Sequence, residues 1–241
     1  MIYFFSYGDD KYKNSKHRIR QEAINFGFDR VDVYGREDIS PEFIEKTQPY
    51  INMPRGGGYW LWKPYFLKKT FEMMKEGDYC VYADAGCTVN PNGKIRFNDY
   101  LKMIDSKGIL SFRLDGFLEE WFTTEEIFKN FNIEKSSTLR RSDHLMATIY
   151  ILKKCDSSIE VVNDYFKLSI TKPDLFSDIY NSSGNCESFR DNRHDQSVFS
   201  ILRKLNKSIE LSDETYSDSL KGWQILYYDK KIPFLSTRIR N

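Results

Sequence analysis

The chain has 241 residues, enough to bury a large hydrophobic core without the support of disulfides or a structural metal. Its 36 basic and 35 acidic residues give a net charge of +1, which argues against nucleic acid or a membrane surface as a partner. No stretch approaches the ~20 apolar residues of a membrane span. The four cysteines lack the spacing of a zinc site or a disulfide framework, so we expect a cytoplasmic protein in a reducing compartment.

The first half of the chain alternates between apolar runs and stretches with helical spacing. Residues 2–6 are apolar and follow no basic segment, so they predict a first strand rather than a signal peptide. The turn cluster Tyr7-Gly8-Asp9 closes this strand. The further elements predicted here are helices over 15–26, from 41 onward behind Ser40 as N-cap, and over 60–75, and strands over 31–34 and 79–83.

The second half is more varied and contains a long polar segment. Residues 177–193 are rich in Ser, Asn and Gly and predict a loop. Residues 145–152 are apolar and β-branched, which fits a strand or a helix end that runs into one. The further strands predicted here are one over 108–112 and two short ones after 205, and the further helices lie over 97–104, 157–168 and 195–205. One more helix is predicted from a capping Thr123 or Thr124 to 128, with Glu126 completing a capping box against Thr123.

Alternation of strands and helices in the first half predicts an α/β fold with a parallel sheet. In such sheets ligands bind at the carboxyl ends of the strands. The strand over 2–6 ends at Tyr7-Gly8-Asp9, and the strand over 79–83 ends at Asp84. We therefore expect both ends to border one crevice.

Three consecutive glycines, Gly56 to Gly58, stand inside the run RGGGYWLWKPY. Backbone without side chains lets a bulky ligand approach closely, and Lys63 or Arg55 can supply the countercharge for a diphosphate. The spacing matches neither a P-loop nor GxGxxG. The alternative is a flexible loop before an amphipathic helix, with Trp60 and Trp62 in the core, and the pattern alone leaves both open.

Asp84 follows an apolar run and precedes the small residues Ala85 and Gly86. A carboxylate in this place can hold a divalent cation that bridges two phosphates, or accept a hydrogen bond from a ribose. Capping of a strand end is the alternative. One carboxylate alone makes a poor Mg²⁺ or Mn²⁺ site, so a metal here needs ligands from elsewhere in the chain.

Arg193, His194, Asp195 and Gln196 form the second dense polar cluster, at the start of the helix predicted over 195–205. Arg193 and His194 can meet phosphate or substrate hydroxyls, and Asp195 can orient an acceptor hydroxyl or act as its general base. An acidic residue near a helix N-terminus is also favourable for the helix dipole. Four adjacent polar side chains exceed what capping requires, so the cluster favours function.

The remaining histidines show no ligand spacing. His17 is expected on a solvated helix face, and residues 140–144 predict an exposed basic turn in preference to an acceptor-binding edge. The sequence contains no nucleophile elbow with a Ser-His-Asp set, no HExxH and no redox pair.

Three motifs in chain order, GGGYWLWKPY, GDYCVYADAGC and RHDQSVFSIL, resemble small bacterial and viral glycosyltransferases of the GT-A fold. Many members serve capsule, O-antigen or other surface-polysaccharide synthesis. The resemblance follows motif order over about residues 1 to 205. It implies one GT-A-like domain over residues 1–241, with a Rossmann-like, mostly parallel sheet flanked by helices. Residues 1–115 would mainly bind the nucleotide-sugar and residues 116–241 mainly the acceptor.

The same resemblance implies roles for single residues. Asp84 stands at the first position of the DxD signature, whose carboxylates bind the donor's ribose and its metal, and Gly86 stands where the second Asp would be. That departure puts metal dependence in question. The implied residues are Tyr7, Gly8, Asp9, Arg55, Gly57, Gly58, Lys63, Asp84, Ala85 and Gly86 for the donor nucleotide, Arg193, Gln196 and Trp60 for the acceptor, Asp195 and His194 for catalysis, and Asp84 for a metal.

The implied activity is transfer of a sugar from a nucleoside-diphosphate sugar, with a UDP-sugar favoured, to a hydroxyl of an oligosaccharide or polysaccharide acceptor. The only cofactor considered is a divalent cation, Mn²⁺ or Mg²⁺, and no organic cofactor is expected. Peripheral association with a membrane-bound glycan assembly is compatible with this role. Two alternatives stay open, namely a catalytically inactive nucleotide- or sugar-binding module of the same fold and a nucleotidyltransferase.

Overall fold

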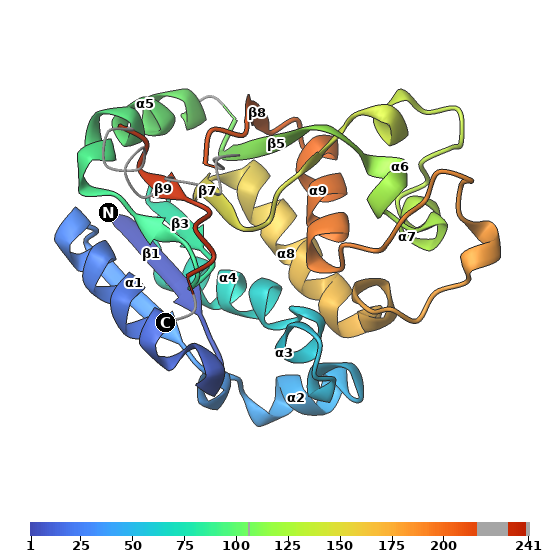
Figure 1. Ribbon diagram of the computed structural model, residues 1–241, viewed down its shortest axis with the longest axis horizontal. Coiled ribbons are helices and arrows are strands. Elements are labelled where there is room, and N and C mark those ends of the chain that lie inside the picture. The colour runs from blue at the N-terminus through green and yellow to red at the C-terminus, as the bar shows by residue number, and fades with distance from the viewer. Residues whose placement is uncertain (106, 216–230, 240–241) are drawn as a thin grey trace.

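A computed structural model of the chain describes residues 1–105, 107–215 and 231–239, and it is built on one seven-stranded sheet (Figure 1). The strands of this sheet are β1 (Ile2–Tyr7), β2 (Arg30–Tyr34), β3 (Tyr79–Ala83), β5 (Ile109–Leu118), β6 (Asp143–Leu145), β7 (Ile149–Lys153) and β8 (Ile209–Ser212). Their order is β2-β1-β3-β7-β5-β6, and β8 also pairs with β5. Two short strands, β4 (Thr88–Val89) and β9 (Phe234–Leu235), form a second, antiparallel sheet.

The sheet is mixed but mostly parallel. Strands β1, β2, β3, β5 and β8 run in one direction, and β6 and β7 run against them. The helices are α1 (Lys13–Phe26), α2 (Pro41–Thr47), α3 (Gly56–Tyr59), α4 (Trp62–Met73), α5 (Lys94–Ile104), α6 (Glu119–Phe122), α7 (Glu125–Asn130), α8 (Asp156–Thr171) and α9 (Asp195–Leu205). The predicted α/β class, with a mostly parallel sheet flanked by helices, is confirmed.

Two hydrophobic clusters lie on the two faces of the sheet. Helices α1 and α5 cover one face, and α4, α8 and α9 cover the other (Figure 1). Successive strand residues point to opposite faces, so Phe4 packs in the first cluster and Phe5 in the second. Both side chains are fully buried, which stabilises the fold by about 1.5–3 kcal/mol each.

Strands β1 and β3 are parallel neighbours, with Phe5 opposite Tyr82. Their carboxyl ends therefore lie at the same edge of the sheet, as the sequence predicted. The segment Tyr7-Gly8-Asp9 leaves β1 there, and Asp84 leaves β3 beside it. This edge is where the candidate site is built.

The helix predicted over 60–75 begins later and ends earlier in the structure, because α4 spans Trp62–Met73. The three preceding glycines have φ of 61°, 60° and 99°, and Trp60 has φ of 57°. These glycines belong to the short segment α3, and left-handed backbone through α3 and Trp60 prevents a right-handed helix from forming before α4. Pro64 lies in the first turn of α4, as predicted.

The predicted capping box between Thr123 and Glu126 is wrong. Thr124 caps α7, because its side chain accepts a hydrogen bond from the backbone N–H of Ile127 at 3.3 Å. Thr123 instead donates to the Glu119 carboxylate at 3.0 Å, inside the protein.

The exposed basic turn predicted over 140–144 is also wrong. Arg140 is 5% exposed and donates two hydrogen bonds to Glu125. His144 is fully buried, with Nδ1 2.6 Å from Glu119 Oε2. Both side chains are buried because each has a carboxylate partner inside the protein, a pairing that sequence spacing does not reveal.

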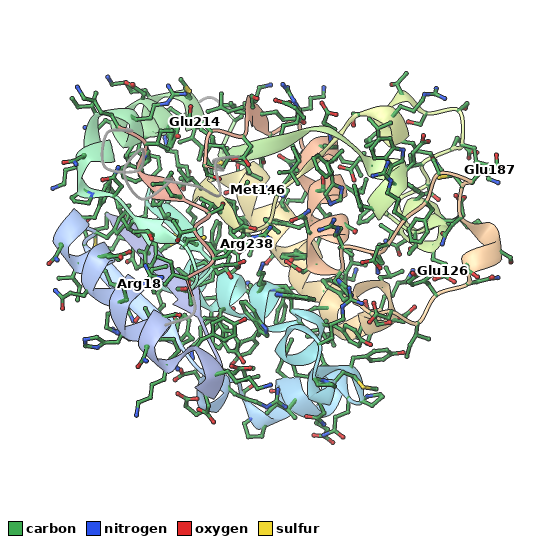
Figure 2. The ribbon with its side chains drawn as sticks, in the orientation of Figure 1. Arg18, Glu126, Met146, Glu187, Glu214 and Arg238 are labelled. Carbon is green, nitrogen blue, oxygen red and sulfur yellow. The ribbon has the colours of Figure 1, made fainter. Side chains whose placement is uncertain are left out.

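The C-terminal segment returns to the centre of the molecule, where Figure 2 shows Arg238. Its strand β9 pairs with β4, and the backbone N–H of Ile239 donates to Gly86 O at 2.9 Å. From the other side, Arg18 of α1 donates to Ala85 O at 3.0 Å. The loop after β3 is therefore fixed by two distant parts of the chain. Over the described residues, none of the helices combines the length and the apolar character needed to cross a bilayer.

Candidate active site

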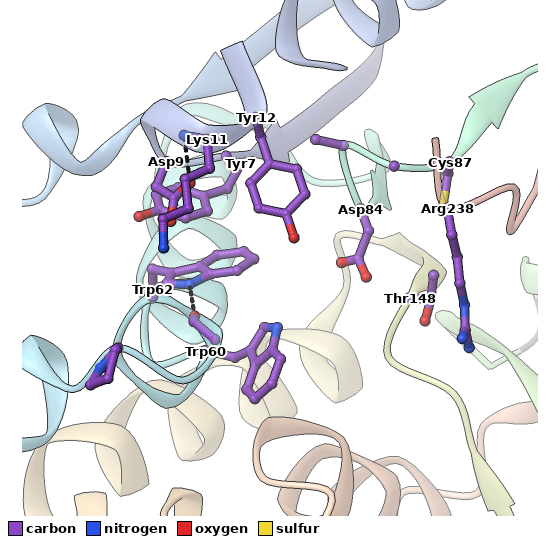
Figure 3. A pocket seen from close by; sticks show the side chains of 16 residues that line it. Tyr7, Asp9, Lys11, Tyr12, Trp60, Trp62, Asp84, Cys87, Thr148 and Arg238 are labelled. Atoms are coloured by element: carbon purple, nitrogen blue, oxygen red, sulfur yellow. Dashed lines mark hydrogen bonds between the residues drawn. The ribbon is translucent and has the colours of Figure 1, made fainter. Parts of the chain in front are cut away.

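A cavity of about 540 Å³ opens at the carboxyl ends of β1 and β3 (Figure 3). Its size lies in the range typical of small-molecule sites, ~300–1,000 Å³. It is lined by Tyr7, Gly8, Asp9, Lys11, Tyr12, Pro54, Gly56, Gly57, Trp60, Trp62, Asp84, Ala85, Gly86, Cys87, Thr148 and Arg238. Four parts of the chain thus meet around one space, namely the loops after β1 and β3, the glycine turn and the C-terminal segment. The sequence led us to expect all of these except the C-terminal segment.

One wall of the cavity is aromatic. Trp62 stacks on Tyr7, with ring centroids 4.0 Å apart and planes inclined by 22°. The indole Nε1 of Trp62 donates to Gly56 O at 2.9 Å, which fixes the ring against the glycine turn. Tyr12 and Trp60 point toward the same space in Figure 3. Burial raises the pKa of Tyr7 to about 12, so its phenol is neutral at physiological pH.

The three glycines have different surroundings. Gly57 lines the cavity, and a Cβ there would meet nothing closer than 3.7 Å. A Cβ on Gly58 would clash with the backbone carbonyl of Ile51, so this glycine permits close packing of two backbone segments. Gly58 and Arg55, both predicted to bind the donor, do not line the cavity.

Asp84 lies at the end of β3 with its carboxylate directed into the cavity (Figure 3). Its Oδ1 accepts a hydrogen bond from the hydroxyl of Tyr82 and lies 3.2 Å from the ammonium of Lys63. The side chain is 35% exposed, and no hydrogen bond to its Oδ2 is found among the described residues. Its second oxygen can therefore accept from a ligand.

Gly86, which the resemblance aligns with the second DxD carboxylate, lies close to the C-terminal segment. A Cβ on Gly86 would lie 3.3 Å from Arg238 Cα, and its carbonyl accepts from Thr237 Oγ1 at 2.8 Å and from the backbone of Ile239. The C-terminal segment packs on this glycine, so a side chain here would require that segment to shift by a few tenths of an ångström.

Lys63 extends from the first turn of α4 and is 3% exposed. Its ammonium lies 3.1 Å from Asp195 Oδ2 and donates to Ala147 O at 3.0 Å. The contact with Asp195 is an ion pair rather than a well-aligned hydrogen bond. Burial alone would lower the pKa of Lys63, but Asp195 and Asp84 together raise it. Lys63 is therefore charged, although it was predicted to face a diphosphate and does not line the cavity.

Asp195 begins α9 and is 3% exposed. Burial raises its pKa to about 6, although the Lys63 ammonium acts in the opposite direction. The adjacent Gln196 accepts from the backbone N–H of Ala147 at 3.1 Å. Neither side chain lines the cavity, and both instead fix the elements behind Asp84.

His194 and Arg55 belong to a polar cluster next to Trp60. The His194 ring lies 5.0 Å from Trp60 and 5.5 Å from Tyr59, with Nε2 2.9 Å from Asp178 Oδ1. Burial is the main cause that lowers the pKa of His194. Arg55 donates to Asp178 and to Asp191, at 3.0 and 3.2 Å.

Arg193 is exposed, and its guanidinium lies over the ring of Phe122 at 4.5 Å. It does not line the cavity either. Of the residues predicted for the acceptor, only Trp60 does so. The acceptor roles of Arg193 and Gln196 therefore stay predictions.

The side chains around Asp84 do not fit a divalent metal site. Mn²⁺ and Mg²⁺ require several oxygen ligands, usually with more than one carboxylate. Over residues 1–105, 107–215 and 231–239, no three His, Cys, Asp or Glu side chains converge as such a site. The second carboxylate near Asp84, that of Asp195, is paired with the ammonium of Lys63, which Asp84 also contacts.

The sequence did not point to several cavity residues. Tyr12 and Lys11 follow the acidic turn after β1, and the turn was their only local signal. Thr148 precedes β7, and Arg238 comes from the last ten residues. No local pattern marks these two, because they reach the cavity only through long-range packing.

These features define the chain as having the α/β fold of GT-A glycosyltransferases, with a cavity at the strand ends. Among solved structures it is similar to a glycosyltransferase involved in glycosylation of the major capsid of PBCV-1. That match has 10% identity and a TM-score of 0.51, and it covers 97% of this chain and 92% of the other. Such low identity shows the fold alone.

Other similar structures have lower scores. Mouse xyloside xylosyltransferase 1, in its apo form, has 10% identity and a TM-score of 0.48, covering 98% of this chain and 97% of that one. The galactosyltransferase LgtC, in complex with donor and acceptor sugar analogues, has 13% identity and a TM-score of 0.46, covering 98% and 86%. No protein-family model and no curated protein matches the sequence.

Proposed function

We propose that the protein transfers a sugar from a nucleoside-diphosphate sugar to a hydroxyl of a glycan acceptor. The observation that carries this proposal is the cavity itself. It combines the stacked pair Tyr7 and Trp62 with an acidic residue, Asp84, at the carboxyl end of β3, in a glycosyltransferase fold. An aromatic surface suits a nucleobase, and a carboxylate suits ribose or sugar hydroxyls.

The donor would span the cavity. We place the nucleobase at Tyr7 and Trp62, and the diphosphate beside the backbone of Gly57, where side chains do not obstruct it. Lys11 and Arg238 are the basic residues of the lining, and we propose that they neutralise the negative charge of the leaving diphosphate. A UDP-sugar is the first donor to test.

The acceptor would enter beside Trp60, which lines the cavity and contacts His194. An indole face is a suitable platform for a sugar ring. For Asp195 and His194, the catalytic residues expected from the sequence, we propose roles exerted through neighbours. Asp195 would act through Lys63, and His194 would position Trp60.

The biological setting rests on the sequence motifs. We propose a cytoplasmic enzyme of capsular or other surface-polysaccharide synthesis, whose acceptor is a growing glycan. Peripheral association with a membrane-bound assembly would bring enzyme and acceptor together.

Ligand-induced thermal stabilisation is the first test. A nucleoside diphosphate or nucleotide-sugar at 100 times its Kd should stabilise the folded state by about 2.7 kcal/mol. A panel of UDP-, GDP- and other nucleotide-sugars would identify the donor. If no member raises the melting temperature, the proposal is wrong.

Product analysis separates the alternatives. Donor hydrolysis or transfer that falls in Asp84→Ala supports an enzyme, whereas equal background rates in wild type and variant indicate an inactive binding module. A product mass that shows nucleotide transfer would assign a nucleotidyltransferase.

A further inference from the structure

The three motifs singled out in the sequence meet at one atom, the ammonium nitrogen of Lys63. Lys63 belongs to the first motif, Asp84 to the second and Asp195 to the third. The ammonium lies 3.2 Å from Asp84 Oδ1 and 3.1 Å from Asp195 Oδ2. It is therefore in contact with both carboxylates at once.

The position of this ammonium is closely defined. It donates to Ala147 O at 3.0 Å and lies over the ring of Tyr82, 5.2 Å from the centroid. Ala147 is itself fixed, because its N–H donates to Gln196 at 3.1 Å. Lys63 is 3% exposed and contacts oxygen atoms from three separate parts of the chain, so its position is fixed, unlike that of a surface lysine.

Two carboxylates that face one point repel each other unless a cation lies between them. A divalent metal is one such cation, and it would bring two positive charges and require further oxygen ligands. Lys63 supplies one positive charge to the pair and leaves a net charge of −1, with the Asp84 carboxylate directed toward the cavity. The Asp84 carboxylate is therefore suited to accept hydrogen bonds from hydroxyl groups of a ligand.

We propose that Lys63 is the resident cation of this site, standing between Asp84 and Asp195 in place of a divalent metal, so that donor binding needs no Mn²⁺ or Mg²⁺. Asp84 then binds hydroxyl groups of the donor directly through Oδ2. This inference rests on the proposed function for the identity of the ligand, but the charge arrangement itself does not depend on it. Lys63 is a positioning residue that acts through Asp84.

Metal dependence tests the proposal in the wild-type protein. Affinity for the nucleoside diphosphate selected from the panel should agree within about twofold in EDTA and in Mn²⁺. Mn²⁺ alone should leave the melting temperature unchanged. A loss of about tenfold or more in EDTA, restored by Mn²⁺, would overturn the proposal.

Replacement of the lysine gives a second, independent test. Lys63→Met leaves two uncompensated carboxylates, so its melting temperature should rise with Mn²⁺, and Asp84→Asn added to it should abolish the rise. Lys68→Met is the matched control, because Lys68 lies on the same helix with an exposed partner, Glu72. A folded Lys63→Met protein without any Mn²⁺ response would contradict the proposal.

The two proposals fail in different ways. Absence of nucleotide binding in EDTA and in Mn²⁺ alike would refute the proposed function, while the Mn²⁺ melting experiments would still decide the role of Lys63. Should Lys63→Met not fold, the comparison of EDTA with Mn²⁺ in the wild type decides the matter.

Discussion

The indole of Trp62 lies on the ring of Tyr7 with 4.0 Å between centroids, and this pair joins the glycine turn to the end of β1. Both rings line the cavity, yet both are at most 5% exposed. The pair therefore belongs to the core and to the site at once. For Trp62, the interpretation as a core residue and the interpretation as part of the candidate site both hold.

Removing the aromatic face of Trp62 should weaken nucleotide binding. Trp62→Leu keeps an apolar side chain but loses the stacking surface, which is worth about 1–3 kcal/mol per base, so affinity should fall about tenfold or more. Calorimetric titration measures it. Tyr7→Phe is the control, because the Tyr7 hydroxyl finds no hydrogen-bond partner among the described residues and its loss should be nearly neutral. An unchanged affinity in Trp62→Leu would remove the nucleobase from this wall.

Two glycines of the turn, Gly57 and Gly58, should differ in how much stability is lost when each is replaced by alanine. Gly58→Ala should destabilise the protein by about 3 kcal/mol, because its Cβ clashes with Ile51 and its φ is positive. Gly57→Ala meets no close atom and should cost only about 1–2 kcal/mol of backbone strain. Chemical denaturation measures both. Equal losses in the two variants would contradict this account.

We expect Lys11, and not Arg55, to contribute to binding of the nucleoside diphosphate. Lys11 lines the cavity, whereas Arg55 is paired with Asp178 and Asp191 outside it. Lys11→Ala should weaken nucleoside-diphosphate binding by about tenfold, in a salt-dependent manner. Arg55→Ala should leave this affinity within about twofold and change stability by less than about 1 kcal/mol. The opposite ranking would restore Arg55 to the donor site predicted from sequence.

The buried Glu119 should make the fold sensitive to acid. Burial by itself raises the pKa of Glu119, but His144, Lys204 and Ser200 together lower it below its ordinary value of 4.5. A lowered folded-state pKa means that the stabilisation is present above the unfolded-state pKa and is lost as pH falls through the folded-state value.

Glu119→Gln should therefore lower the free energy of unfolding by about 3 kcal/mol at neutral pH, and the gap to wild type should narrow below about pH 4.5. Denaturation across this pH range checks it. Glu45→Gln, at an exposed position of α2, should show no such gap. A gap that stays constant with pH would show that charge is not the cause.

The sequence by itself determined the elements that have local causes. Strand β3 spans Tyr79–Ala83 and helix α9 spans Asp195–Leu205, both as predicted, because apolar runs and helical periodicity are properties of neighbouring residues. It also placed Asp84 and the turn after β1 at one edge of the sheet, because carboxyl ends of parallel strands meet there.

Only the tertiary structure decided which side chains face the cavity and which lie beneath it. Lys63 and Asp195 were expected to touch substrate, but they are buried behind Asp84 in an ion pair that spans more than a hundred residues of sequence. Arg238 was not considered and lines the cavity. The orientation of a charged side chain depends on the partner that compensates it after packing, and that partner lies far away in the sequence. For this reason the sequence motifs located the site, but only the fold showed which side chains line the cavity and which are buried beneath it.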